Sequence, residues 1–147
     1  MNSRDDAYYR LSLAQGFRDT AERDFARGEW ASCVEHAQLA VENSAKAALV
    51  CWSPLPRTHD LADELATVAD NASDLPAAIL SALQRIADCS RSLGTHERIL
   101  ASYGDERARW TPWQLFTEME AKPALQQARE AVENAERTVE YHYPTAG

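Results

Sequence analysis

The last third of the chain carries the feature that most restricts the possible folds. Apolar and weakly polar residues recur there in unbroken steps of three and four, at Leu125, Ala128, Val132, Ala135, Val139 and His142. This spacing places them on one side of an α-helix and is typical of the seam of a helical bundle. A helix with such a seam needs other helices to cover it.

Two earlier segments have matching apolar stripes. The first covers Arg4 to Arg27 and is followed by Gly28, a residue suited to the left-handed position after a helix. The second runs from about Glu29 to Cys51 and has a broad, alanine-rich apolar face. Because the turn between them is short, the two segments are predicted to form an antiparallel helical hairpin.

Two shorter helices are predicted after Pro54 and Pro56. Thr58 is expected to cap the first of them. The next should have Pro76 in its first turn and end near Leu93, with Gly94 as its stop.

From Thr95 to about Lys122 the apolar pattern is poorer, so we expect a long connection with at most one helical turn. Pro123 should limit how far back the last helix reaches. The sequence therefore predicts an all-α protein, an antiparallel four- to five-helix up-and-down bundle in which residues 1–147 form a single domain.

Composition excludes several classes of function. The net charge of −8 and the pI of about 4.9 argue against binding of duplex DNA, which requires a basic face. The three cysteines at 33, 51 and 89 form no metal-binding or disulfide pattern and fit small buried apolar positions. No stretch of 18 apolar residues and no signal peptide are present, so we expect no membrane association and a cytoplasmic location.

One stretch resembles the second helix of HEPN domains. Residues 36–49 read HAQLAVENSAKAAL, similar to the family pattern A-x-x-A-x-E-x-x-x-K-A-x-L. Residues 57–61 (RTHDL) resemble the family's T-H-x-L element, and residues 102–105 (SYGD) lie where members carry an R-Y-P-D-like loop. The resemblance covers roughly residues 4–139.

The resemblance to HEPN domains implies a helical bundle that forms a homodimer. It also implies pairing with a small nucleotidyltransferase in a toxin–antitoxin or defence module, and binding of nucleotide or single-stranded RNA. On this basis the candidate nucleotide- or partner-binding residues are Glu42, Lys46, Tyr103 and Asp105.

HEPN ribonucleases resemble one another in an R-x(4–6)-H motif, which Arg91 and His96 match. A histidine can take the proton of a ribose 2′-hydroxyl or protonate the leaving 5′-oxygen at neutral pH. An arginine can hold the phosphate and offset the charge of the transition state. Such a pair would cleave RNA as a metal-independent endoribonuclease and needs no cofactor.

The same residues also have structural interpretations. On one continuous helix, residues five apart point about 140° away from each other, so Arg91 and His96 converge only if Gly94 breaks the helix. Otherwise Arg91 ends a helix against its dipole and His96 lies in a solvated loop. Glu42 and Lys46 have the i, i+4 spacing of a helical ion pair.

The remaining candidates have similar alternatives. His36 is expected on a helix face and His59 near a helix start, and His59 with Asp63 gives only half of a metal site, so no metal is expected. The aromatic residues Trp110, Trp113 and Phe116 could stack on bases or anchor the connection to the last helix.

Two function hypotheses follow from these observations. The first is a HEPN-like component of a nucleotidyltransferase-paired module that binds nucleotide or RNA, with or without RNA cleavage. The second is a non-catalytic dimeric helical scaffold that docks a protein partner.

Overall fold

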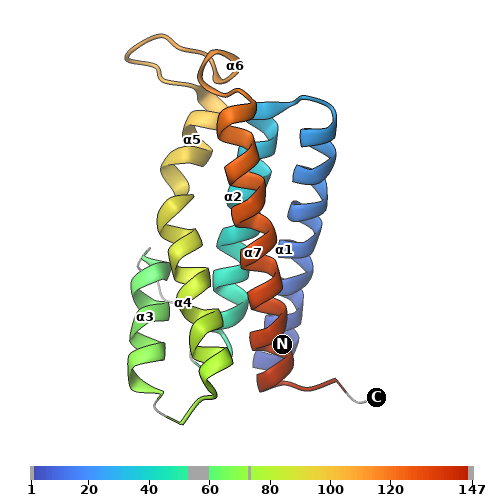
Figure 1. The fold of residues 1–147 in the computed structure, drawn as a ribbon, viewed down its shortest axis with the longest axis vertical. Coiled ribbons are helices and arrows are strands. Elements are labelled where there is room, and N and C mark those ends of the chain that lie inside the picture. The colour runs from blue at the N-terminus through green and yellow to red at the C-terminus, as the bar shows by residue number, and fades with distance from the viewer. Residues whose placement is uncertain (1, 53–59, 73, 146–147) are drawn as a thin grey trace.

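The computed structural model describes residues 2–52, 60–72 and 74–145, and these residues form a helical bundle (Figure 1). Their helices are α1 (Ser3–Ala26), α2 (Trp30–Leu49), α3 (Leu61–Asn71), α4 (Ala77–Ser92), α5 (Thr95–Tyr103), α6 (Pro112–Leu115) and α7 (Glu118–His142). The only strand-like pairing in the described part of the chain is an isolated bridge between Asp105 and Trp110. The predicted all-α class is confirmed.

The main helices of the bundle alternate in direction (Figure 1). α1 and α2 form the first hairpin, α4 and α5 stack end to end as one column, and α7 returns along the bundle. α3 packs outside this set, against α4 and α2. The start of α1 and the end of α7 lie at one end of the bundle, and α6 lies at the opposite end with the loop of residues 104–111.

α2 is the central helix of the bundle. It contacts all six other helices, and 13 of its 20 residues are buried. The buried set is rich in alanine, whose small side chain lets neighbouring helices approach closely, while Val34, Val41 and Leu49 fill the space between them. The predicted seam of α7 covers this face, and Val132, Ala135 and Val139 are fully buried.

The first hairpin forms as predicted. Gly28 has φ +71°, the left-handed conformation that glycine adopts without a steric penalty. Its N–H donates to the carbonyl of Phe25 at 3.1 Å, and Glu29 N–H donates to the carbonyl of Asp24 at 2.9 Å. These bonds close the C-terminus of α1 and direct the chain into α2.

The prediction of a long connection after Thr95 was wrong. This region contains α5, α6 and the first turn of α7. Charged residues such as Glu97 and Arg98 interrupt the apolar pattern of α5. The helix forms because it packs on α2 and because Glu97 accepts a hydrogen bond from Gly94 N–H at its start.

The starts of α7 and α4 differ from the predictions. α7 begins at Glu118, five residues before Pro123, because losing one hydrogen bond near a helix start is tolerated when Thr117 caps the helix. Asp60 caps α3 by accepting from Asp63 N–H at 3.0 Å. Thr58 and His59 lie outside the described residues. Pro76 is the residue before α4 rather than part of its first turn.

Candidate functional site

Arg91 and His96 lie on consecutive helices that Gly94 separates. Arg91 is in the last turn of α4, and His96 is in the first turn of α5 rather than in a loop. Gly94 has φ −97°, so the break does not depend on a left-handed glycine. The Gly94 N–H instead donates to Glu97 Oε2 at 2.8 Å, which starts the new helix.

The two motif side chains are both exposed. Arg91 Nη1 lies 3.5 Å from Asp88 and Nη2 lies 3.9 Å from Asp63, with the Arg91 side chain 51% exposed. Within the described residues, no hydrogen bond or ion pair joins Arg91 to His96. Exposed ion pairs of this kind contribute less than about 1 kcal/mol, so a phosphate can replace the carboxylates at little cost.

The other four candidate residues are spread over two regions. Glu42 and Lys46 form the i, i+4 ion pair on α2, with 3.4 Å between Oε2 and Nζ. Tyr103, at the end of α5, is 73% exposed. Asp105 holds the following loop together, because its backbone pairs with Trp110 and its carboxylate accepts from Ala108 N–H at 3.1 Å.

A buried carboxylate joins α1 to α2 through two side chains. Asp24 is only 5% exposed, and its Oδ2 lies 2.7 Å from His36 Nδ1 and 2.8 Å from Ser32 Oγ. A carboxylate accepts hydrogen bonds, which assigns the donor hydrogen to His36 Nδ1 and leaves Nε2 on the other side of the ring. The imidazole also stacks on Phe17, with 6.3 Å between ring centroids.

This network was not predicted, although the sequence contains a signal for it. Asp24 and Ser32 lie four residues before and after Gly28, so a tight hairpin brings them opposite each other. His36 follows Ser32 by one helical turn on the same face of α2. The interpretation of His36 as a simple helix-face residue therefore missed its partner on α1.

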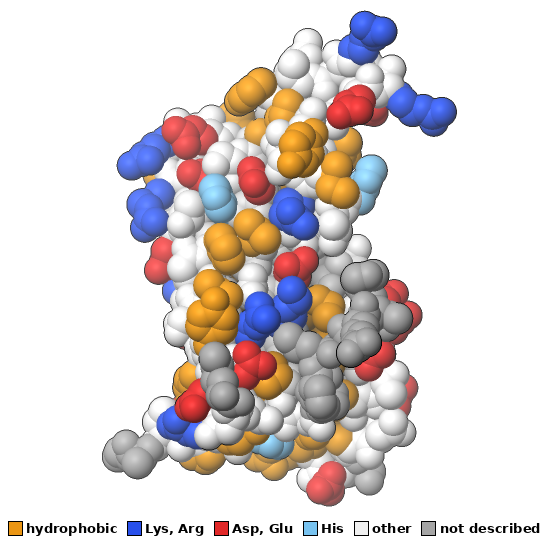
Figure 2. Space-filling view, turned by 180° about the vertical axis from the view of Figure 1, so that it is seen from behind, with side chains coloured by type: hydrophobic (Ala, Val, Ile, Leu, Met, Phe, Trp, Pro, Cys, Tyr) orange, Lys and Arg blue, Asp and Glu red, His pale blue; other side chains and the backbone are white. Residues whose placement is uncertain are grey.

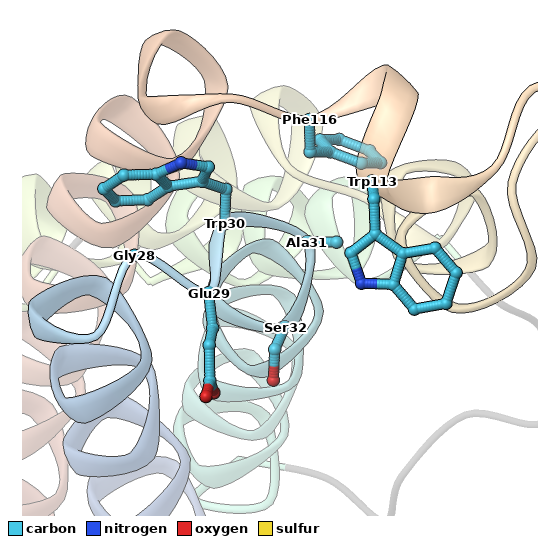
Figure 3. Close-up of a pocket in the computed structure, with 7 residues that line it drawn as sticks. All are labelled: Gly28, Glu29, Trp30, Ala31, Ser32, Trp113 and Phe116. Atoms are coloured by element: carbon cyan, nitrogen blue, oxygen red, sulfur yellow. The ribbon is translucent and has the colours of Figure 1, made fainter.

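Two adjoining pockets lie where α2 begins, beside α5 and α6. The first is about 430 Å³ in volume and is lined by Gly28, Glu29, Trp30, Ala31, Ser32, Trp113 and Phe116 (Figure 3). The second is about 450 Å³ in volume and is lined by Ala31, Ser32, Glu35, Arg98, Ala101, Ser102, Tyr103, Pro112 and Trp113. Ala31, Ser32 and Trp113 belong to both, so we call the two together the α2-end groove.

The aromatic residues around the α2-end groove differ in their environment. Phe116 is 9% exposed and anchors the segment before α7, as one of the two interpretations predicted. Trp113 is 79% exposed, and its ring lies beside Ala31 and Ser32 (Figure 3). Trp110 is 50% exposed and lines neither pocket. Trp113 and Tyr103, which is 73% exposed, are thus the two highly exposed aromatic side chains that line the groove.

Arg98 supplies the positive charge of the α2-end groove. Its Nε is buried and has no hydrogen-bond partner among the described residues. The guanidinium lines the second pocket, where a positively charged donor makes strong hydrogen bonds to an anion. Arg98 was not predicted as a site residue, because it lies in a segment that was predicted to be a connection.

The three cysteines do not form a reactive site. Burial raises the pKa of each of the Cys33, Cys51 and Cys89 thiols to about 12. They therefore stay protonated at neutral pH and act as small apolar residues of the core.

The described residues contain no cluster of three or more histidine, cysteine, aspartate or glutamate side chains that could hold a metal ion. None of the helices in residues 2–52, 60–72 and 74–145 combines the length and apolarity that a membrane span requires.

The comparison that identifies the family is a match of the HEPN domain model to residues 7–139. The chain belongs to the HEPN domain family. This HEPN protein is also similar to the crystal structure of TT1696 from Thermus thermophilus, with a TM-score of 0.64 and 21% sequence identity. The match covers 94% of this chain and 99% of that one and supports the fold. No curated protein sequence gives a significant match.

Proposed function

We propose that this HEPN protein binds single-stranded RNA and cleaves it without a metal, as one component of a nucleotidyltransferase-paired module of toxin–antitoxin or defence type. The observation that supports this best is the break at Gly94. It leaves Arg91 and His96 exposed on two consecutive helices instead of on opposite sides of one helix.

The chemistry assigns a separate role to each motif residue. His96 takes the proton of the 2′-hydroxyl or protonates the leaving 5′-oxygen. Arg91 leaves its surface contacts with Asp63 and Asp88 to hold the phosphate, because a bidentate arginine–phosphate contact is stronger than two long ion pairs. The internal 2′-hydroxyl is the nucleophile, so the product carries a 2′,3′-cyclic phosphate.

The decisive experiment follows cleavage of a single-stranded RNA in EDTA. We expect the wild-type protein to cut it, and His96→Ala to lower the rate by about 10²–10⁴, the usual loss when a positioned acid or base is removed. Arg91→Ala should lower the rate as well. Arg85→Ala is the matched control, because Arg85 is an exposed arginine of the same helix with an ion pair to Glu130 at 3.9 Å.

Three results would reject the cleavage proposal. They are intact RNA with the wild-type protein, activity that disappears in EDTA, and a His96→Ala variant as fast as the wild type. A nucleotidyltransferase encoded beside this protein, purified with it as one complex, would support the proposed module. Its failure to bind would reject that pairing.

A second candidate function, a dimeric scaffold that docks a protein partner, is favoured by a different observation. Several large apolar side chains at the end of the bundle that carries α6 are exposed, namely Ile99, Tyr103, Trp110, Trp113 and Met119. If this is the function, the purified protein should be a dimer in light scattering and leave RNA uncut. A monomer would contradict both the scaffold and the homodimer that the family resemblance implies.

A further inference from the structure

We propose that the α2-end groove binds a ribonucleotide, with the base on Trp113, the phosphate at Arg98 and the ribose hydroxyls at Glu35. This inference rests on the proposed binding of RNA and names where and how the protein recognises it. It does not require cleavage. His96 and Arg98 lie on α5 two residues apart, which places their side chains about 160° apart around the helix. The groove and His96 are therefore on different faces of α5.

The size of the α2-end groove suits a ligand of this class. Its two pockets measure about 430 and 450 Å³. Ligand sites for small molecules and cofactors span roughly 300–1,000 Å³ and combine apolar walls with a few polar groups. The groove has this composition, because indole and phenol rings border it together with the Arg98 guanidinium, the two carboxylates of Glu29 and Glu35, and the hydroxyls of Ser32 and Ser102.

The aromatic part of the groove provides a surface for a base. Trp113 is 79% exposed although its indole borders both pockets, and Tyr103, 73% exposed, borders the second. Exposing two large aromatic rings to water at one site is unfavourable unless a ligand covers them. Stacking of a base on an aromatic ring tolerates any base, so this part of the groove does not select a sequence.

The charged part of the groove provides a place for a phosphate. Arg98 lines the second pocket, and its guanidinium has no ion pair within the described part of the chain, so a phosphate is a favourable counter-ion for it. The first turn of α2 has no side-chain cap, so its N–H groups beside Ala31 and Ser32 add donors at the same wall. Ser32 is itself held in place by Asp24, at 2.8 Å.

Glu35 makes the site selective for a ribose. Its side chain borders the second pocket together with Arg98. A carboxylate repels a phosphate but accepts hydrogen bonds from hydroxyl groups, so its favourable neighbour in a nucleotide is the sugar. The 2′-hydroxyl distinguishes RNA from DNA. The pair of Arg98 and Glu35 therefore matches the phosphate and ribose of one ribonucleotide.

The test uses isothermal titration calorimetry with three probes, which are adenosine 5′-monophosphate, 2′-deoxyadenosine 5′-monophosphate and adenosine. We expect the first to bind and the other two to bind about tenfold more weakly, because each lacks one contact to a charged side chain. Glu35→Gln should remove the difference between the ribonucleotide and the deoxyribonucleotide. Arg98→Ala should remove the difference between the nucleotide and the nucleoside.

The aromatic contact has its own variant and matched controls. Trp113→Ala should weaken binding of the ribonucleotide about 5–100-fold, the usual effect of removing a stacking ring. Trp110→Ala and Arg107→Ala change an exposed indole and an exposed guanidinium outside the groove and should leave binding unchanged. Arg98→Gln is a second variant in case Arg98→Ala does not fold, and circular dichroism checks each protein.

Three outcomes would overturn the proposed site. They are no binding of adenosine 5′-monophosphate, equal binding of all three probes, and equal losses in the groove variants and the control variants. The same proteins are assayed for RNA cleavage. If nucleotide binds but RNA stays intact, only the cleavage proposal fails. If RNA is cut as fast by Trp113→Ala and Arg98→Ala as by wild type and no nucleotide binds, only the groove proposal fails.

Discussion

Two regions of the molecule each contain a histidine, and these histidines, His36 and His96, have opposite environments. His36 is held by buried Asp24 on another helix, at 2.7 Å, and packs against Phe17. His96 is exposed in the first turn of α5, and the structure gives it no hydrogen-bond partner in the described residues. The R-x(4–6)-H motif contains His96, whereas His36, which is held by Asp24, belongs to no recognisable motif.

This difference separates two uses of a histidine. A side chain that must bind a substrate and transfer a proton needs access to solvent, which His96 has. A side chain that links two helices needs a fixed partner, which Asp24 gives to His36. The histidine of the R-x(4–6)-H pattern, His96, is accessible to solvent. The histidine between α1 and α2, His36, is held in one position by its contact with Asp24. Figure 2 shows the molecule from behind the view of Figure 1, and on this face hydrophobic side chains lie between charged ones.

The largest expected change in stability concerns His36. His36→Ala should lower the free energy of unfolding by about 2 kcal/mol, because it leaves the buried carboxylate of Asp24 with one partner fewer. His96→Ala should change it by no more than about 0.5 kcal/mol, as is typical of exposed residues. Urea unfolding followed by circular dichroism measures both. Equal losses would show that the two histidines do not differ in this way.

The start of α5 allows a second comparison, between Glu97 and Gly94. Glu97→Ala should cost about 1 kcal/mol, because the Gly94 N–H loses its acceptor. Gly94→Ala should cost no more than about 0.5 kcal/mol, since the nearest atoms to an added Cβ lie at ordinary distances of 3.5 and 3.6 Å and φ is negative. Thermal unfolding of the two variants tests this order. The reverse order would mean that glycine itself maintains the break.

Ser32 sharpens the comparison on the side of Asp24. Ser32→Ala should cost about 1 kcal/mol, and its effect should not add to that of His36→Ala, because both side chains share the oxygen Oδ2 of Asp24. A double-mutant cycle by urea unfolding measures the coupling. Strict additivity would show that the three side chains do not act as one network.

The smallest expected effect comes from an exposed pair that, like the Asp24 network, joins two helices. The Arg129 guanidinium lies 2.7 Å from Glu22 and lowers the pKa of that carboxyl below its ordinary value of 4.5. The folded pKa is depressed, so the pair stabilises the protein above pH 4.5 and loses this effect as the pH falls through the folded pKa. Because both side chains are substantially exposed, the contribution is at most about 1 kcal/mol.

Unfolding of wild type and Glu22→Gln between neutral and acidic pH tests this pair. The difference in stability between the two proteins should shrink as the pH falls below 4.5. A difference that grows towards low pH would contradict the assigned direction of the pKa change.

Much of the bundle was predictable because helices are encoded locally. The steps of three and four in α1, α2 and α7 specify which side of each helix is buried, and Gly28 specifies a tight turn. Cys33, Cys51 and Cys89 were predicted to be buried and are. The ion pair of Glu42 and Lys46 was also predictable, since residues four apart on a helix are neighbours.

The contacts between helices were decided by the tertiary structure. Periodicity identifies the buried side of one helix but not the residue of another helix that faces it, which depends on the relative shift and path of both. Asp24 meets His36 because of how α1 and α2 align, and Arg91 meets Asp63 because α3 packs on α4. The α2-end groove exists because α5 is a helix packed on α2, so Arg98 and Trp113 come together only in the folded chain.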